Sequence, residues 1–174
     1  MSSRRAFVLA SLSGSVALLA GCLESSEDDA GDAEGMSDND LEAVLDQYES
    51  AAATHSDAVD ALGQGFTSYH DSQYEDAREQ FAAAEESFAA ADFRDISESI
   101  TDEQEATQTV RDARETNSDA EIAASNCKTS SENLSMDPNQ TSEKQTIEGV
   151  KQRYQDGEFE IPTRQDLEDA FNLE

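Results

Sequence analysis

The chain has 174 residues, and its 40 aspartates and glutamates outnumber its 11 lysines and arginines, giving a formal net charge of −29 at pH 7. This charge excludes nucleic acid as a partner, because backbone phosphates must be neutralised by Lys and Arg. It argues equally against a body that lies on an anionic bilayer. In dilute salt such self-repulsion opposes a compact fold. At 1 M salt the Debye length falls to about 3 Å, so the composition predicts a protein suited to concentrated brine.

The first residues have the order of an export signal and not of a membrane span. The apolar run over residues 6–20 is about fifteen residues long, whereas a spanning helix needs about twenty. Arg4 and Arg5 precede the run, and small residues lie just before Cys22. This order predicts that residues 1–21 are a signal peptide that is cleaved.

The basic end of this segment resembles a known export motif. Residues Ser3 to Val8 read SRRAFV and contain Arg4, Arg5 and Phe7. This sequence resembles the twin-arginine motif, whose substrates typically fold before they are translocated. The resemblance implies export of an already folded protein.

The other end of the segment resembles a lipobox. Leu19, Ala20 and Gly21 directly precede Cys22. In lipoproteins with this motif the cysteine is lipidated on sulfur and becomes the first residue after cleavage. Both motifs in this order, with the acidic composition, resemble the twin-arginine-exported lipoproteins of halophilic archaea. The resemblance implies that membrane lipid on Cys22 holds the protein at the outer face of the cell membrane. The alternative is an ordinary signal peptide with an incidental cysteine.

An acidic tether is expected after the signal. Residues 23–40 hold eight acids and no base, and like charges stretch such a segment. At about 3.3 Å per residue it reaches at most about 60 Å. We therefore assign residues 22–40 to a lipidated cysteine and a disordered spacer, which would hold the folded part away from the membrane.

Two long helices are predicted next, joined by a short turn at residues 70–73. Asp38 or Asp40 can cap a first helix that begins at Leu41. Apolar residues then recur every three or four positions, which is the pattern of a helix that faces a partner surface. The positions in the first helix are Leu41, Leu45, Tyr48, Ala52, His55, Val59, Leu62, Phe66 and Tyr69. Those in the second are Tyr74, Ala77, Phe81, Ala84, Phe88 and Ala91.

Part of this predicted hairpin resembles a single tetratricopeptide repeat. The matching positions lie within residues 62–84 and are Leu62, Gly63, Phe66, Tyr74, Ala77, Phe81 and Ala84. In that family the helices cross closely at a small residue and the concave face binds peptide segments. The turn here is about two residues longer than in the repeat, and no second copy follows 34 residues later, although such arrays need several stacked units.

The remaining chain predicts further helices. Residues 101–104, Thr-Asp-Glu-Gln, have the pattern of a capping box, and helical spacing continues to residue 134 with a possible break at 117–119. Residues 136–138 should end this helix. A weaker helix ends at Asp156–Gly157, an extended piece covers 158–162, and Thr163 caps a closing helix. The fold class is therefore all-α, an antiparallel helical bundle built on a long hairpin. Residues 41–136 form its core, and 137–174 form a loop with small helices packed on or near it.

No residue constellation indicates catalysis. His55 occupies a buried helix position, where a core histidine is the expected role, and His70 lies near the turn. Cys127 is the one thiol left once Cys22 is lipidated, and we expect it to be buried. The sequence lacks paired Cys and His spacings and phosphate-binding glycine loops. We predict no catalytic residue, no metal site and no cofactor, and hence a protein that is not an enzyme.

Two sequons for N-glycosylation occur, at Asn133 and Asn139. Such sites are used in exported chains where the asparagine is exposed. Asn139 belongs to the predicted loop after the long helix, so it is the better acceptor of the two.

These features favour a lipid-anchored extracytoplasmic protein that acts by contact with another protein, as yet unknown, or with an envelope component. The alternative is a carrier of a small molecule or metal that feeds a membrane complex, with His55 and nearby tyrosines lining a cavity. A hydrolase is the least supported class.

The charge makes a direct prediction about salt. When the salt concentration falls from molar to tens of millimolar, unscreened repulsion among the carboxylates should reduce the helical circular dichroism of the exported domain. An unchanged spectrum across this range would contradict adaptation to brine.

Overall fold

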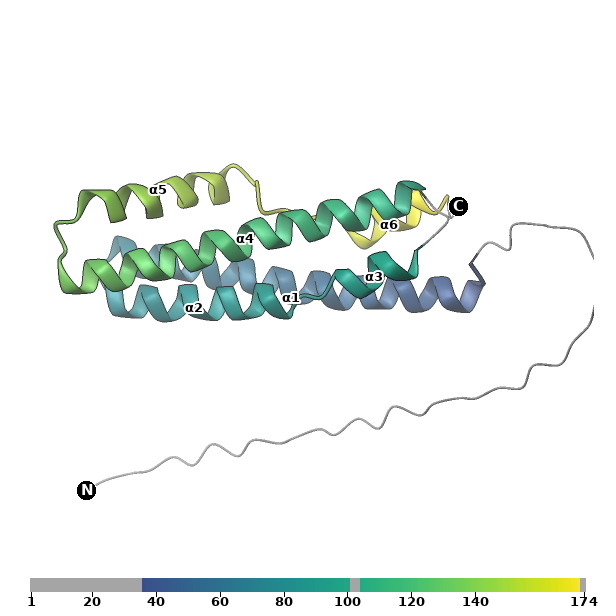
Figure 1. Ribbon diagram of the computed structural model, residues 1–174, viewed down its shortest axis with the longest axis horizontal. Helices are drawn as coiled ribbons and strands as arrows, with labels where there is room; N and C mark the ends of the chain where they lie inside the picture. Colours follow the sequence, from purple (N-terminus) through teal and green to yellow (C-terminus); the bar gives the residue numbers. More distant parts are fainter. Residues whose placement is uncertain (1–35, 101–103, 173–174) are drawn as a thin grey trace, which may run out of the picture. The chain divides into compact units, whose positions relative to one another are not determined.

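The computed structural model describes residues 36–100 and 104–172, and every regular element within these ranges is an α-helix (Figure 1). The helices are α1 (Asp38–His70), α2 (Tyr74–Ala90), α3 (Arg94–Ser99), α4 (Gln104–Met136), α5 (Thr141–Gln155) and α6 (Arg164–Ala170). The prediction of an all-α antiparallel bundle is confirmed. None of the helices in these two ranges is long and apolar enough to cross a membrane.

Several predicted features lie outside the described residues. They are the signal peptide with Arg4, Arg5 and Phe7, the lipobox Leu19, Ala20 and Gly21, the lipidation site Cys22, the spacer up to residue 35, and positions 101–103 of the predicted capping box.

The first helix begins earlier than the sequence predicted. α1 starts at Asp38 and not at Leu41, so the last three residues assigned to the disordered spacer are helical. Ser37 is the cap, and its hydroxyl oxygen accepts a hydrogen bond from the backbone N–H of Asp40 at 3.3 Å. The Ser37 hydroxyl in turn donates to the Asp40 carboxylate at 2.6 Å. The serine that precedes the helix accepts a hydrogen bond from an N–H group of the first turn, which is the role of an N-cap. The assignment of Asp38 or Asp40 as the cap was therefore wrong.

The hairpin of α1 and α2 is confirmed, with its turn at residues 71–73. The apolar positions predicted for the second helix are buried except Tyr74, which is half-buried, and most of those for α1 are buried. Three predicted α1 positions differ, since Leu41, Ala52 and Val59 are only half-buried. Residues beside them, Val44, Ala51 and Ala58, are buried. The reason is that α1 packs on α2 along one side and meets α5 and α6 on another. A helix with several neighbours buries a broader face than a single seam.

Helix α4 is continuous over 33 residues, and the break predicted at 117–119 is absent. Asn117 is buried, and its side chain bonds to groups on other elements, so it does not compete for the backbone of its own helix. Small side chains on α4 pack against α2, and the helix ends at Met136 as predicted. Ala113, Ala120 and Ala124 are among its fully buried residues.

The core consists of two clusters of buried residues. One joins the last half of α1, α2, α4 and α5, and includes Phe66, Phe81 and Phe88. The other joins the first half of α1 with α3, the start of α4 and α6, and includes Tyr48 and Phe93. Figure 1 accordingly shows α5 beside one end of α4 and α6 beside the other.

Helix α6 is held in place by its predicted Thr163 cap and by ion pairs of Arg164. The backbone N–H and the hydroxyl of Thr163 both donate to the Asp166 carboxylate, and these bonds hold the pKa of Asp166 below its usual value. Arg164 pairs with Glu168 of its own helix and with three carboxylates of α1. The Tyr48 hydroxyl also donates to the Pro162 carbonyl at 2.6 Å. The predicted extended piece before α6 begins as a turn, at Glu158 and Phe159.

The two helices of the hairpin approach each other closely at Gly65. A Cβ atom added there would lie 2.4 Å from a ring carbon of Phe81, and that ring is fully buried. Gly65→Ala should therefore destabilise the protein by about 1–3 kcal/mol through overpacking. The measurement is the free energy of unfolding in denaturant at molar salt.

Gly149 provides the matched control for this substitution. It is an exposed helical glycine with no atom within 4 Å of an added Cβ. Gly149→Ala should stabilise the protein by up to about 1 kcal/mol, because alanine is the better helix former. Equal effects of the two substitutions would contradict the close packing of Phe81 on Gly65.

Candidate binding groove

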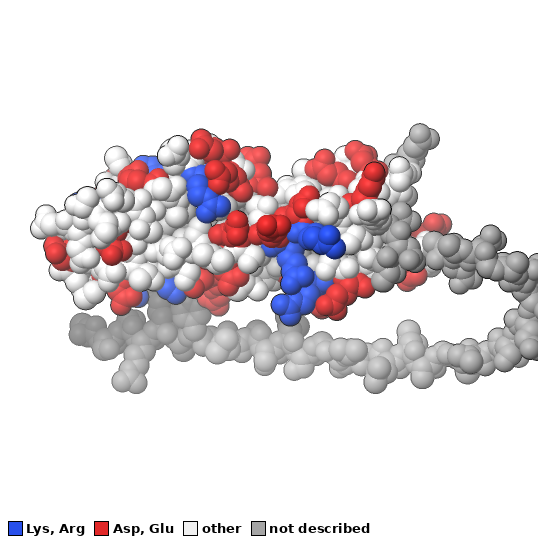
Figure 2. Space-filling model, turned by 45° about the horizontal axis from the view of Figure 1, so that its top comes forward, with Lys and Arg blue, Asp and Glu red and all other residues white. Residues whose placement is uncertain are grey.

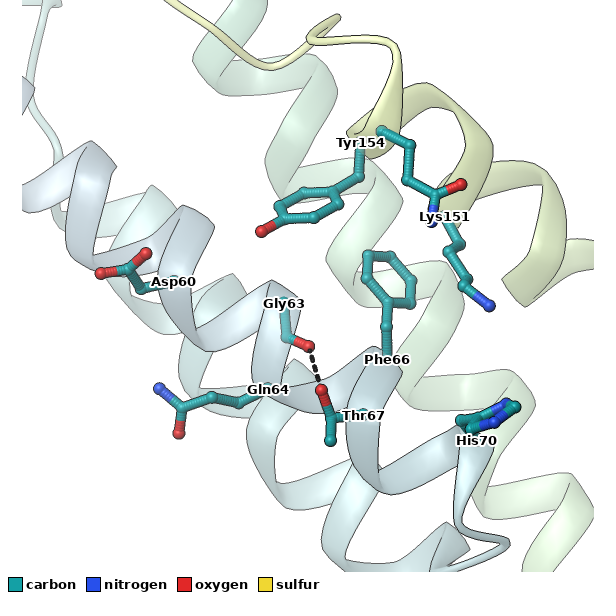
Figure 3. Close-up of a pocket in the computed structure, with 9 residues that line it drawn as sticks. Asp60, Gly63, Gln64, Phe66, Thr67, His70, Lys151 and Tyr154 are labelled. Carbon is teal, nitrogen blue, oxygen red and sulfur yellow. Dashed lines mark hydrogen bonds between the residues drawn. The ribbon is translucent and has the colours of Figure 1, made fainter.

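A groove lies between the last third of α1 and the exposed side of α5. It holds about 630 Å³. Its lining, drawn in Figure 3, comes from these two helices alone. The residues are Asp60, Gly63, Gln64, Phe66, Thr67, His70, Lys151, Tyr154 and Gln155.

The groove exists because α5 packs mainly on α4 and only lightly on α1. Ile147 and Val150 bury themselves in the core, which fixes that face of α5. One turn further on, Lys151, Tyr154 and Gln155 face the groove from the same helix. Helices α1, α2, α4 and α5 therefore pack closely where α1 meets α2, α2 meets α4 and α4 meets α5. The side between α1 and α5 stays open.

Two aromatic rings form the centre of the groove. Phe66 is only 5% exposed, and its ring packs edge-on against Phe81 at 5.3 Å between centroids. Tyr154 lies against the other side of Phe66, with centroids 5.4 Å apart. The Phe66 side of the groove is thus held by the core of the hairpin, whereas Tyr154 belongs to the lightly packed helix.

Tyr154 reaches this position across Gly63. A Cβ atom added at Gly63 would lie 2.7 Å from the Tyr154 hydroxyl oxygen, so the glycine gives this hydroxyl its space. The hydrogen bonds among the described residues do not include this hydroxyl. Tyr154 also lines the groove.

Polar groups surround the aromatic centre. In Figure 3 Asp60 lies at one end of the groove and His70 at the other, with Phe66 and Tyr154 between them. Lys151 is 3.5 Å from the Glu148 carboxylate, a long contact that leaves its ammonium group able to bind an anion. The arrangement combines an apolar wall with separated groups of both charges, as small binding sites do.

The groove lining offers several polar groups beside its aromatic rings. Within the described residues, no three His, Cys, Asp or Glu side chains gather closely enough to hold a metal ion. The lining holds hydroxyl groups on Thr67 and Tyr154 and an ammonium group on Lys151. What its residues can supply is an aromatic surface, hydrogen bonds and charge.

The histidines predicted from the sequence have different surroundings. His55 is buried at 3% exposure, which confirms the interpretation as a core residue, and it does not line the groove. Both its ring nitrogens lie 2.8 Å from oxygen atoms, those of the Asn117 side chain and the Phe159 carbonyl. His70 is exposed and lines the groove.

The two sequons also differ in exposure. Asn139 is exposed in the turn between α4 and α5, where an enzyme can reach it. Asn133 is half-buried within α4, and its carbonyl accepts a hydrogen bond from the backbone N–H of Asp137 at 3.0 Å. The structure therefore favours Asn139 as the acceptor.

Sequence reasoning did not find the groove. Phe66 and Tyr154 had the spacing of core residues, and Lys151 had no feature that distinguished it from other surface charges. Gly63 was the available signal, because a glycine within a helix often allows close approach of another element. The partner that approaches it is 91 positions away in the chain, at Tyr154.

Comparison with protein-family models, curated proteins and solved structures gives no match to this chain. The resemblances to exported lipoproteins and to a tetratricopeptide repeat therefore remain predictions that depend on the motifs quoted above.

The thiol of Cys127 is fully buried, and burial raises its pKa to about 12. Because the thiolate is the reactive form, this cysteine should resist iodoacetamide at about pH 8 in the folded protein and react once denaturant is added. Mass spectrometry of a Cys22→Ser variant measures this reaction at Cys127 alone. Rapid alkylation under native conditions would contradict the burial of Cys127.

Proposed function

We propose that the protein is a lipid-anchored, extracytoplasmic helical module that binds a segment of another protein in the groove between α1 and α5. The anchor and the location rest on the signal peptide and lipobox motifs. The binding site rests on one observation, which is the aromatic groove where α5 packs only lightly on α1. This function requires no reactive group.

The two walls of the groove suit a binding role. Phe66 is supported from behind by Phe81, so this side is rigid and ready before a partner arrives. A preformed surface reduces the entropy that binding must offset. Tyr154 on the opposite wall offers a ring and a hydroxyl, the kind of side chain that is enriched where proteins meet.

The charges indicate the chemistry of the partner segment. It would place an apolar or aromatic side chain against Phe66 and Tyr154, and an acidic group near Lys151 and His70. The resemblance of residues 62–84 to a tetratricopeptide hairpin supports the same kind of partner, because that family binds peptide segments. Asp60 at the far end would favour a donor from the partner.

A small-molecule carrier is the second candidate. The groove volume of about 630 Å³ supports it, because sites for small ligands usually measure about 300–1,000 Å³. In this alternative the ligand would occupy the groove and not a cavity around His55, whose ring nitrogens are already engaged.

Site-specific crosslinking tests the proposal. A photoreactive amino acid at Gln64, which is exposed and lines the groove, should give a discrete protein adduct in intact cells held in molar salt. The matched control carries the same group at Glu79, which is exposed on α2 outside the groove, and should give none.

Two further measurements separate the alternatives. Cys22→Ser should remove the adduct or release it from the membrane fraction, because the protein would lose its anchor. A protein adduct absent at Gln64, together with a small molecule found by native mass spectrometry of the purified protein, would overturn the contact role in favour of the carrier.

A further inference from the structure

The two walls of the groove present their side chains in the same order. On α1, His70 follows Phe66 by four positions, and on α5, Lys151 precedes Tyr154 by three. Figure 3 shows Lys151 and His70 toward the same end of the groove, beyond the rings of Phe66 and Tyr154. The groove therefore has a ring level, formed by Phe66 and Tyr154, and next to it a nitrogen level, formed by Lys151 and His70.

The separation of the two levels corresponds to about one turn of an α-helix. A step of three or four residues advances a helix by about 4.5–6 Å, and this holds for both walls. A partner helix that lies along the groove has the same rise, and its residues three or four positions apart share one face. One such pair of partner residues would therefore meet both levels at once.

The backbone of the walls favours a helical partner over an extended one. Both walls are α-helices, whose N–H and C=O groups bond within each helix, and the Thr67 hydroxyl of the lining donates to the Gly63 carbonyl at 3.2 Å. An extended segment would bring two free polar backbone groups per residue to this surface, and burying them unpaired costs free energy. The side-chain amides of Gln64 and Gln155 are too few to pair with them. A helical segment has already satisfied its own backbone.

The length of the groove sets the length of this segment. On α1 the lining extends from Asp60 to His70, which is about 15 Å at about 1.5 Å per residue. A helix of about ten residues, or nearly three turns, has the same length. An isolated helix of this size is only marginally stable in water. The segment would therefore belong to a helix that a larger protein already contains.

The nitrogen level lies where the chain is least negative. Among the helices of the described residues, α5 alone has more bases than acids, with three against two. The last turn of α1 contains His70 and no acid. The Lys151 ammonium group has a long contact of 3.5 Å with Glu148, which is exposed and does not line the groove. In a chain with a net charge of −29, this end of the groove is thus suited to an acidic group of the partner.

We infer that the partner segment is an amphipathic α-helix of about three turns that lies along the groove. It places an apolar side chain on the ring level and an acidic side chain, three or four positions away, against Lys151 of the nitrogen level. The inference rests on the function proposed above, and it adds the conformation of the partner and the spacing of its two contact residues.

Selection from two peptide libraries tests the conformation. The purified Cys22→Ser protein, in molar salt, is offered peptides randomised on one face of a fixed helical scaffold. In parallel it is offered the same number of randomised positions in a disulfide-closed β-hairpin. The helical library should be enriched, and the enriched peptides should share an apolar and an acidic residue three or four positions apart.

The other outcomes separate the inference from the proposed function. Enrichment of the hairpin library, or of helical peptides without this spacing, would overturn the inference while leaving a groove that binds protein segments. If neither library were enriched, the proposed function itself would be contradicted.

A charge exchange tests the contact with Lys151. For the best helical peptide, Lys151→Glu should weaken binding by about tenfold or more, because a hydrogen bond to a charged group is lost. A peptide with lysine in place of its acidic residue should bind Lys151→Glu more tightly than it binds the wild type. This rescue shows that the variant keeps its groove, so a loss of binding without rescue would overturn the contact.

Lys144→Glu is the matched control for this exchange. Lys144 belongs to the same helix and does not line the groove. Because charges farther apart than about 3 Å are screened at 1 M salt, this substitution should change the affinity by less than about twofold. Equal losses of affinity for the two substitutions would overturn the pairing of the partner's acidic residue with Lys151.

Discussion

The fold depends on the close packing of α1 against α2, and in particular on the Phe81 ring against the backbone of Gly65. This contact brings the two helices near enough for Phe66 to lie edge-on against Phe81. The small side chains of α4 then lie flat against the other side of α2. The hairpin is therefore the support for every later element, and the rigidity of the Phe66 side of the groove follows from it.

A second constraint is the shortage of positive charge. The ion pairs between helices use few bases, and each links two elements: Lys128 pairs with Glu85 across α4 and α2, Arg153 with Asp119 across α5 and α4, and Arg164 with carboxylates of α1. Figure 2 shows Lys and Arg in small groups beside Asp and Glu on the face that it draws. Partly exposed pairs contribute little each to stability, so the apolar clusters and not these pairs hold the helices together.

The groove and the hydrogen bond from His55 both lie where α5 and the segment after it pack only lightly on α1. Because α5 packs on α4 and only lightly on α1, the space between α1 and α5 is open to a ligand. Because α5 makes few contacts with α1, the hydrogen bond between His55 and the Phe159 carbonyl is one of the contacts that join α1 to the segment after α5. An element held by few contacts is the part of a fold most able to move.

The sequence by itself determined the helices other than α3 and most of their buried faces, because helix formation and its 3.6-residue period are local properties of the chain. It also indicated a turn, predicted at 70–73 and found at 71–73, and the Thr163 cap. Only the tertiary structure decided what lies against each face. Asn117 read as a helix break, yet α4 continues through it because His55 and the Phe88 carbonyl bind its side chain. Likewise Tyr154 meets Gly63 and Phe66 through long-range packing, which no local pattern encodes.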